Sequence, residues 1–184
     1  MFRYTFLGSA IAVALIAVPM SIHAQQMGAM SDSDYTAKIM AAAPASVVKG
    51  ANIIRMNTNG SVRTLQTGAN GFTCMMVDAG TPGCADRNAM AWMHAYVTHA
   101  APPPGIGFMY MLGGDAGASN TDPYATTRTA SNHWVTTGPH VMIVGPTAKT
   151  LGYPMTADPD PTKPYVMWAD TPYAHAMIPV TVHP

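Results

Sequence analysis

Proline and glycine divide this chain into short segments. The sequence holds 16 prolines and 16 glycines among 184 residues, and both residue types interrupt helices and strand interiors because of their backbone geometry. Such punctuation is typical of a loop-rich domain that contains β-strands. We therefore expect short elements joined by many turns.

Runs of apolar and β-branched residues between these breaks predict the strands. They lie at residues 52–56, 61–66, 72–77, 106–112, 140–144, 165–169 and 175–182. The first three are separated by turns rich in Asn and Gly, which predict a β-meander. The expected fold class is α+β, with a mostly antiparallel sheet of six or seven short strands.

Two helices are expected beside this sheet. Alternating Ser and Asp at residues 31–34 is a helix-start signal for residues 35–43, and Pro44 ends that helix. Residues 86–100 form the main helix, because Asp86 and Asn88 lie in its first turn and no Gly or Pro interrupts it. Three prolines at 102–104 stop it.

The N-terminus has the features of a secretory signal peptide. Arg3 precedes an uncharged apolar run at residues 6–18, which is long enough for a leader and short for a membrane span. We expect cleavage between Ala24 and Gln25, which leaves residues 25–184 as a single soluble domain in the periplasm or outside the cell. Residues 25–50 are expected to include a partly flexible segment.

Charge excludes two classes of partner. The formal net charge is zero, and about −1 after removal of Arg3, with no basic stripe or block of like charge. Nucleic acid and anionic membrane surfaces are therefore poor partners. After cleavage the sequence also offers no second apolar run long enough to span a membrane.

The two cysteines, Cys74 and Cys84, are an even count in an exported chain. This favours a disulfide that closes a short turn. The alternatives are a two-thiolate metal site and a redox-active pair, although reactive pairs usually stand closer together, as in Cys-x-x-Cys.

Two expected strands share the motif His-x-Met-Ile. Side chains alternate across a strand, so His140 and Met142 lie on one face of the first, and His175 and Met177 on one face of the second. If the strands pair, imidazoles and thioethers gather in one patch, and such a set suits copper(I). His94 on the main helix is a further candidate ligand. The alternative is that these residues only fill the core.

A long polar loop at residues 118–132 is a second candidate site, because loops of this length are often functional. Asn120, Asp122 and Tyr124 are its candidate ligand residues. They predict a non-catalytic module that binds a small molecule or another envelope protein. The same composition also fits an Asx-turn that ends at a proline and binds nothing.

Familiar catalytic motifs are absent from the sequence. It contains no Gly-x-Ser-x-Gly, no His-Glu-x-x-His, no phosphate-binding Gly loop and no dinucleotide fingerprint. There is also no Glu, so carboxylate chemistry would depend on nine Asp. A dyad of Asp122 with His140 is left open, and whether the protein is an enzyme is not decided by the sequence.

Four segments carry a resemblance to a known family. They contain Ser-Asn-Thr-Asp-Pro at 119–123, Gly-Pro-His-Val-Met-Ile at 138–143, and residues 165–168 and 171–177. Over about the last two-thirds of the chain, the sequence resembles a family of uncharacterised exported bacterial proteins. The resemblance implies a bacterial periplasmic setting and carries no activity and no site.

Overall fold

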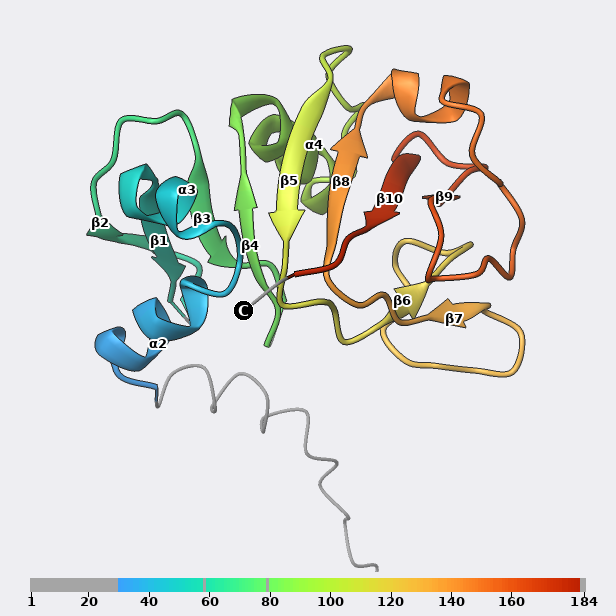
Figure 1. Ribbon diagram of the computed structural model, residues 1–184. Helices are drawn as coiled ribbons and strands as arrows, with labels where there is room; N and C mark the ends of the chain where they lie inside the picture. The colour runs from blue at the N-terminus through green and yellow to red at the C-terminus, as the bar shows by residue number, and fades with distance from the viewer. Residues whose placement is uncertain (1–29, 58, 79, 183–184) are drawn as a thin grey trace, which may run out of the picture.

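A central eight-stranded sheet organises the chain (Figure 1). The computed structural model describes residues 30–57, 59–78 and 80–182, so the expected leader and its cleavage site lie outside the described residues. The strand order is β2-β1-β3-β4-β5-β8-β10-β9. The strands are β1 (Asn52–Met56), β2 (Val62–Gln66), β3 (Thr73–Met76), β4 (Pro82–Ala85), β5 (Gly107–Met111), β8 (His140–Val144), β9 (Tyr165–Met167) and β10 (His175–Pro179).

The α+β class with a large sheet is confirmed, and the number of strands is higher than expected. Each of the seven expected segments contains a strand, most of them shorter at the ends. The eighth, β4, begins with Pro82 and Gly83, residues that normally argue against a strand. A small hairpin of β6 (Ala118–Ser119) and β7 (Trp134–Val135) lies apart from the main sheet.

The expected β-meander is wrong. β2 pairs with β1 in antiparallel fashion, but β3 returns to the other side of β1 and runs parallel to it, with Ile53 opposite Cys74. The segment after β2 crosses the end of a helix, where the amides of Ala69 and Asn70 both donate to the carbonyl of Gly50. These hydrogen bonds fix the segment against the end of α3, so it does not form the tight turn that its composition predicts.

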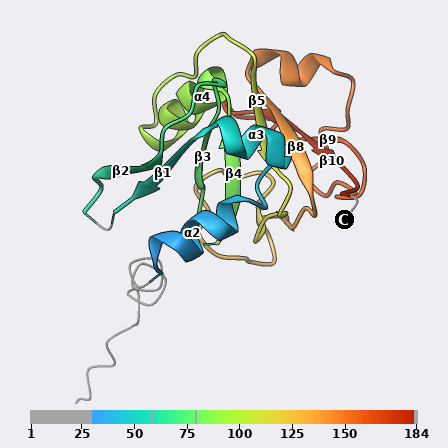
Figure 2. The same ribbon diagram turned by 60° about the vertical axis from the view of Figure 1, so that its left-hand side comes forward.

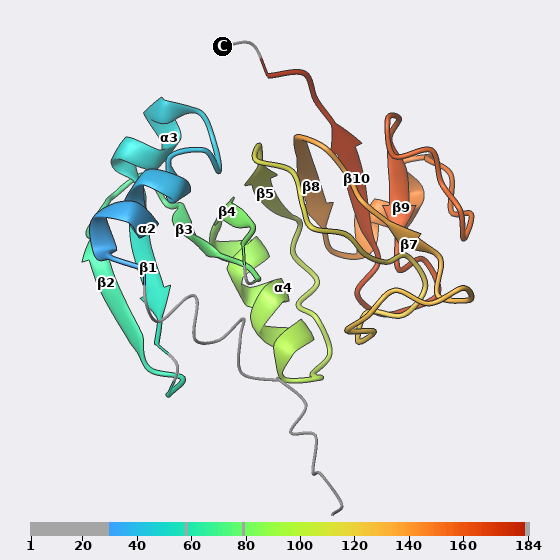
Figure 3. The same ribbon diagram turned by 90° about the horizontal axis from the view of Figure 1, so that it is seen from below.

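Helices cover opposite faces of the sheet (Figures 2 and 3). On one face lie α2 (Asp32–Ile39), capped by the Ser31 hydroxyl, and α3 (Ala45–Gly50), which begins after Pro44. Their buried side chains, including Tyr35, Ile39 and Val48, pack against β1, β3 and β4. The other face is covered by α4 (Arg87–Val97).

α4 approaches β5 so closely that no side chain fits between their backbones. A Cβ on Gly107 of β5 would lie 2.3 Å from the backbone nitrogen of Ala89. The Asp86 carboxylate fixes this contact, because it accepts hydrogen bonds from Ala89 and from Phe108. α4 is shorter than the expected helix at 86–100, since His99 adopts a left-handed φ of 56°.

The predicted disulfide between Cys74 and Cys84 is confirmed. The two residues are directly paired on β3 and β4, with Cα atoms 4.0 Å apart, and both are fully buried. They belong to the core beneath α2 and α3. Within the described ranges, no helix is both long and apolar enough to cross a membrane.

Candidate metal centre

The two His-x-Met strands are neighbours. β8 and β10 pair in antiparallel fashion, with Met142 directly opposite Met177. Directly paired side chains point to the same face, so His140, Met142, His175 and Met177 share one face of the sheet. This is the face covered by α4.

β5 and β9 add thioethers to this face. Met111 lies opposite His140, Met109 opposite Met142, and Met167 opposite His175. We call this set the histidine–methionine face. It consists of Met109, Met111, His140, Met142, Met167, His175 and Met177, each of which is no more than 7% exposed.

His140 presents an unpartnered nitrogen to this interior. Its Nδ1 lies 2.7 Å from the carbonyl oxygen of Gly138 and must donate the proton there, so Nε2 carries the lone pair. Nε2 is buried and has no hydrogen-bond partner among the residues that the structure describes. Burial lowers the pKa of His140, although the Gly138 carbonyl and the charge of Asp115 act in the opposite direction. The imidazole is therefore neutral near pH 7, which is the form that binds metals.

Polar groups surround this end of β8. Asp115 accepts hydrogen bonds from the amides of Gly117 and Thr137, and burial raises its pKa. The Thr137 hydroxyl lies 2.7 Å from that of Tyr165, whose pKa burial raises to about 12. The sequence suggested Asp122 as the acidic partner of His140, but the carboxylate that acts on it electrostatically is Asp115.

His175 has a different environment. Its Nδ1 lies 3.0 Å from the Tyr173 carbonyl oxygen. The ring meets Trp92 and Trp168 edge-on, with centroids 5.2 and 4.8 Å away. Burial lowers the pKa of His175 to about 4, with the hydrogen bond to the Tyr173 carbonyl acting in the opposite direction and His140 contributing to the lowering. These contacts place His175 inside an aromatic cluster.

The register separates the two histidines. His140 lies opposite Pro179 and His175 opposite Val144, so their backbone positions differ by four residues along the strand pair, or about 13 Å. In Figure 1, β8 begins at the lower edge of the sheet and β10 at the upper edge. The side chains directly opposite His140 are those of Met111 on β5 and Pro179 on β10, and Met142 follows two residues along β8 on the same face.

His94 lies outside this face. It is exposed on α4, whereas Ala89, Trp92 and Ala95 are the buried residues of that helix. Across the described part of the chain, no group of three or more His, Cys, Asp and Glu side chains is placed to hold a metal ion. A metal site here would therefore depend on methionine sulfur.

The candidate ligand loop is held by its own polar side chains. The Asn120 amide donates to the carbonyls of Thr156 and Ala157, each at 2.9 Å. Asp122 accepts the amide of Tyr124 in an Asx-turn. The Tyr124 ring stacks on Tyr96 with centroids 5.4 Å apart. All three residues thus make contacts that order the loop.

Comparisons with protein-family models, curated proteins and solved structures give no match. The resemblance to a family of exported bacterial proteins therefore stays a prediction.

Proposed function

We propose that this is an exported protein that binds copper(I) through Nε2 of His140 and the thioethers of Met111 and Met142. The observation that carries the proposal is the buried Nε2 of His140, which has no hydrogen-bond partner among the described residues, on a residue that the register sets directly opposite Met111. A buried polar atom without a partner is costly. A metal bond would satisfy it.

The chemistry of the donor set favours a soft, singly charged ion. Thioethers and imidazole bind copper(I) well, whereas calcium and magnesium require oxygen ligands. The hydrogen bond from Nδ1 to the Gly138 carbonyl has the form of the outer interactions that orient metal-bound histidines. Met109 and Met177, which lie opposite Met142 on either side, are the next thioethers along the face.

The position of this set supports access from solvent. Met111 and His140 stand at one end of their strands, within two residues of Gly113 and Gly138, and both of these glycines are exposed. His175 instead follows the buried residues Tyr173 and Ala174. We assign His175 to packing and leave it outside the coordination shell.

Export rests on the leader at residues 1–24 and on the disulfide. Disulfides persist in oxidising compartments such as the bacterial periplasm and are rare in the cytosol. Fractionation of cells that express the full chain tests this part, because the mature form should appear in the periplasmic fraction with residue 25 as its N-terminus.

Copper(I) titration of residues 25–184 against a chromogenic chelator tests the metal site. We expect one bound equivalent, and a loss of affinity of more than about 100-fold in His140→Asn, beyond the usual effect of an outer-shell change. Asparagine keeps a donor near the Nδ1 position and removes Nε2. His175→Asn is the matched control and should retain affinity.

Two results would reject this assignment. One is a wild-type protein that binds no copper(I), and the other is an equal loss in the two histidine variants. Far-UV circular dichroism of each variant confirms that the fold is retained, so that lost affinity is not confused with unfolding.

A further inference from the structure

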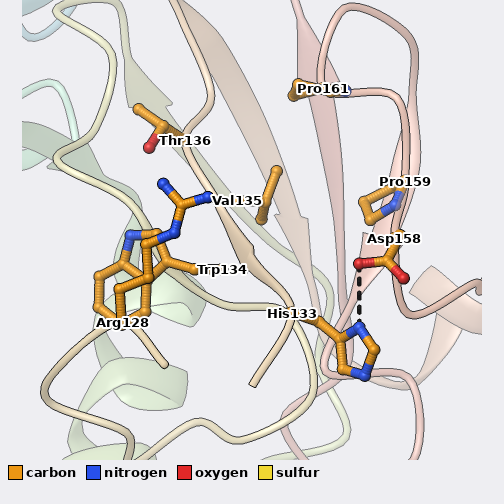
Figure 4. Close-up of a pocket in the computed structure, with 8 residues that line it drawn as sticks. All are labelled: Arg128, His133, Trp134, Val135, Thr136, Asp158, Pro159 and Pro161. Atoms are coloured by element: carbon orange, nitrogen blue, oxygen red, sulfur yellow. Dashed lines mark hydrogen bonds and ion pairs between the residues drawn. The ribbon is translucent and has the colours of Figure 1, made fainter. Parts of the chain in front are cut away.

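A separate cavity of about 310 Å³ opens beside the β6–β7 hairpin, and no residue of the histidine–methionine face lines it. Figure 4 shows Arg128 and Trp134 on one side of it, and His133, Asp158 and Pro159 on the other. Its lining is completed by Val135, Thr136 and Pro161. Arg128 belongs to the candidate loop at residues 118–132, but nothing in the sequence joined that loop to the opposite wall at residues 158–161.

The wall that carries Arg128 is ordered by one side chain. The Asn132 amide donates to the carbonyl of Thr127 at 2.7 Å, and its oxygen accepts the amide of Thr129 at 3.0 Å. These bonds fix the backbone on both sides of Arg128. The Ser119 hydroxyl in turn donates to the Asn132 carbonyl at 2.6 Å, which ties the wall to β6.

The opposite wall is equally well held. The buried Asn120 amide fixes the carbonyls of Thr156 and Ala157, immediately before Asp158. The Asp158 carboxylate lies 2.9 Å from Nδ1 of His133. His133 has a left-handed φ of 49°, a conformation that non-glycine residues adopt at an energetic cost and that gathers at binding sites.

Charge decides what this cavity can attract. Asp158 is already engaged by His133, whereas none of the ion pairs between described residues involves Arg128. The guanidinium is thus a cationic donor group that makes no ion pair with any described residue, while the carboxylate of Asp158, whose partner His133 is charged only if protonated, lies on the opposite wall. The planar donor fork of Arg128 fits a carboxylate with two parallel hydrogen bonds. The lining also offers apolar groups from Trp134, Val135 and two prolines, beside the polar Thr136.

We propose that this cavity binds a small organic monocarboxylate with a ring-sized apolar body. The carboxylate binds Arg128, and the body packs against Trp134 and the prolines. The volume lies at the lower end of the range for ligand pockets, which excludes large ligands. This binding function is independent of the metal site.

Chemical-shift titration of the ¹⁵N-labelled mature protein with benzoate tests the proposal, with benzylamine and inorganic phosphate as comparison probes. We expect saturable benzoate binding with a dissociation constant below about 1 mM. Its shifts should centre on residues 133–136 and the Trp134 indole. Benzylamine should cause no saturable shift, and phosphate should bind at least tenfold more weakly because it lacks the apolar body.

Arg128→Gln should weaken benzoate binding at least tenfold, the usual consequence of losing a charge-assisted hydrogen bond. Arg87→Gln removes the same side chain from the exposed surface of α4 and should change nothing. Arg128→Lys keeps the charge without the fork and should be intermediate. The proposal is overturned if benzoate does not saturate, if phosphate or benzylamine binds as tightly, or if Arg128→Gln, with unchanged shifts elsewhere, binds like the wild type.

Discussion

Met111 and His140 stand directly opposite each other on β5 and β8, two neighbouring strands of the main sheet. Side chains paired in this way have Cβ atoms about 5 Å apart, so a thioether and an imidazole can reach one ion. This relationship, more than the repeated His-x-Met motif, defines the proposed copper site.

Replacement of Met111 by Leu should separate metal binding from packing. Leu has nearly the same volume, so the free energy of unfolding should change by less than about 1.5 kcal/mol. Copper(I) affinity should fall at least tenfold because a soft ligand is lost. Met155→Leu, at a position 53% exposed, is the control. Chelator competition measures both variants, and equal affinities would remove Met111 from the site.

Stability should depend on pH through the buried histidines. Because the pKa of His175 is about 4 in the folded protein, against an ordinary value of 6.5, the unfolded chain takes up a proton first as the pH falls. Stability should therefore fall from pH 7 towards pH 4 and level off below that, with a loss of about 2 kcal/mol between pH 7 and 5. His140, whose pKa is also lowered, adds to the loss.

Urea unfolding at intervals across this range measures the effect, and NMR titration of the histidine ring protons assigns it. The His175 resonance should hold its neutral position down to about pH 5. A His175 that titrates near 6.5, or a free energy of unfolding that stays flat from pH 7 to 5, would contradict the prediction.

Loss of the disulfide should destabilise the fold without abolishing the sheet pairing. The bridge closes a loop with a sequence separation of 10, for which chain entropy predicts about 2 to 3 kcal/mol. Replacement of both Cys74 and Cys84 by Ala should lower the free energy of unfolding by that amount. The wild-type protein in strong reductant should lose the same free energy of unfolding. A different loss in the reduced protein and in the double variant would mean that packing of the cysteine side chains, and not the cross-link, is responsible.

Gly107→Ala should be among the most damaging single changes. The new methyl group would meet the backbone of Ala89, which cannot move without shifting α4. We expect a loss of about 3 kcal/mol in urea unfolding. Gly80→Ala adds a methyl group with nothing within 4 Å and should change stability by less than about 0.5 kcal/mol. Similar values for the two would mean that α4 and β5 are less tightly packed.

Local patterns sufficed to predict most elements of the fold. Apolar runs such as residues 140–144 and 52–56 become strands with those same bounds, because their pattern fits a pleated, half-buried surface. β4 was not predicted from the sequence, because its pairing with β3 and β5 compensates for the unfavourable Pro82 and Gly83. The parallel pairing of β1 and β3 was also not predicted, since it depends on contacts between the segment after β2 and α3.

The candidate site was predicted only within each strand. Alternation correctly assigned His140 and Met142 to one face, and the same rule applies to Met109 and Met111. Nothing local shows that β5 pairs with β8, so the sequence alone does not identify Met111 as a candidate ligand. Asp115, in a glycine-rich turn, acts electrostatically on His140. The tertiary fold brings the two together, and their spacing in the sequence does not predict it.

The sheet also keeps two kinds of sulfur apart. The cystine of β3 and β4 lies beneath α2 and α3, while every thioether of the histidine–methionine face lies on the side covered by α4 or beside it. A copper(I) ion bound at His140 would be screened from the oxidised sulfurs by a full thickness of hydrogen-bonded backbone. One small domain can in this way hold an electron-rich ion and an electron-accepting bond without letting them react.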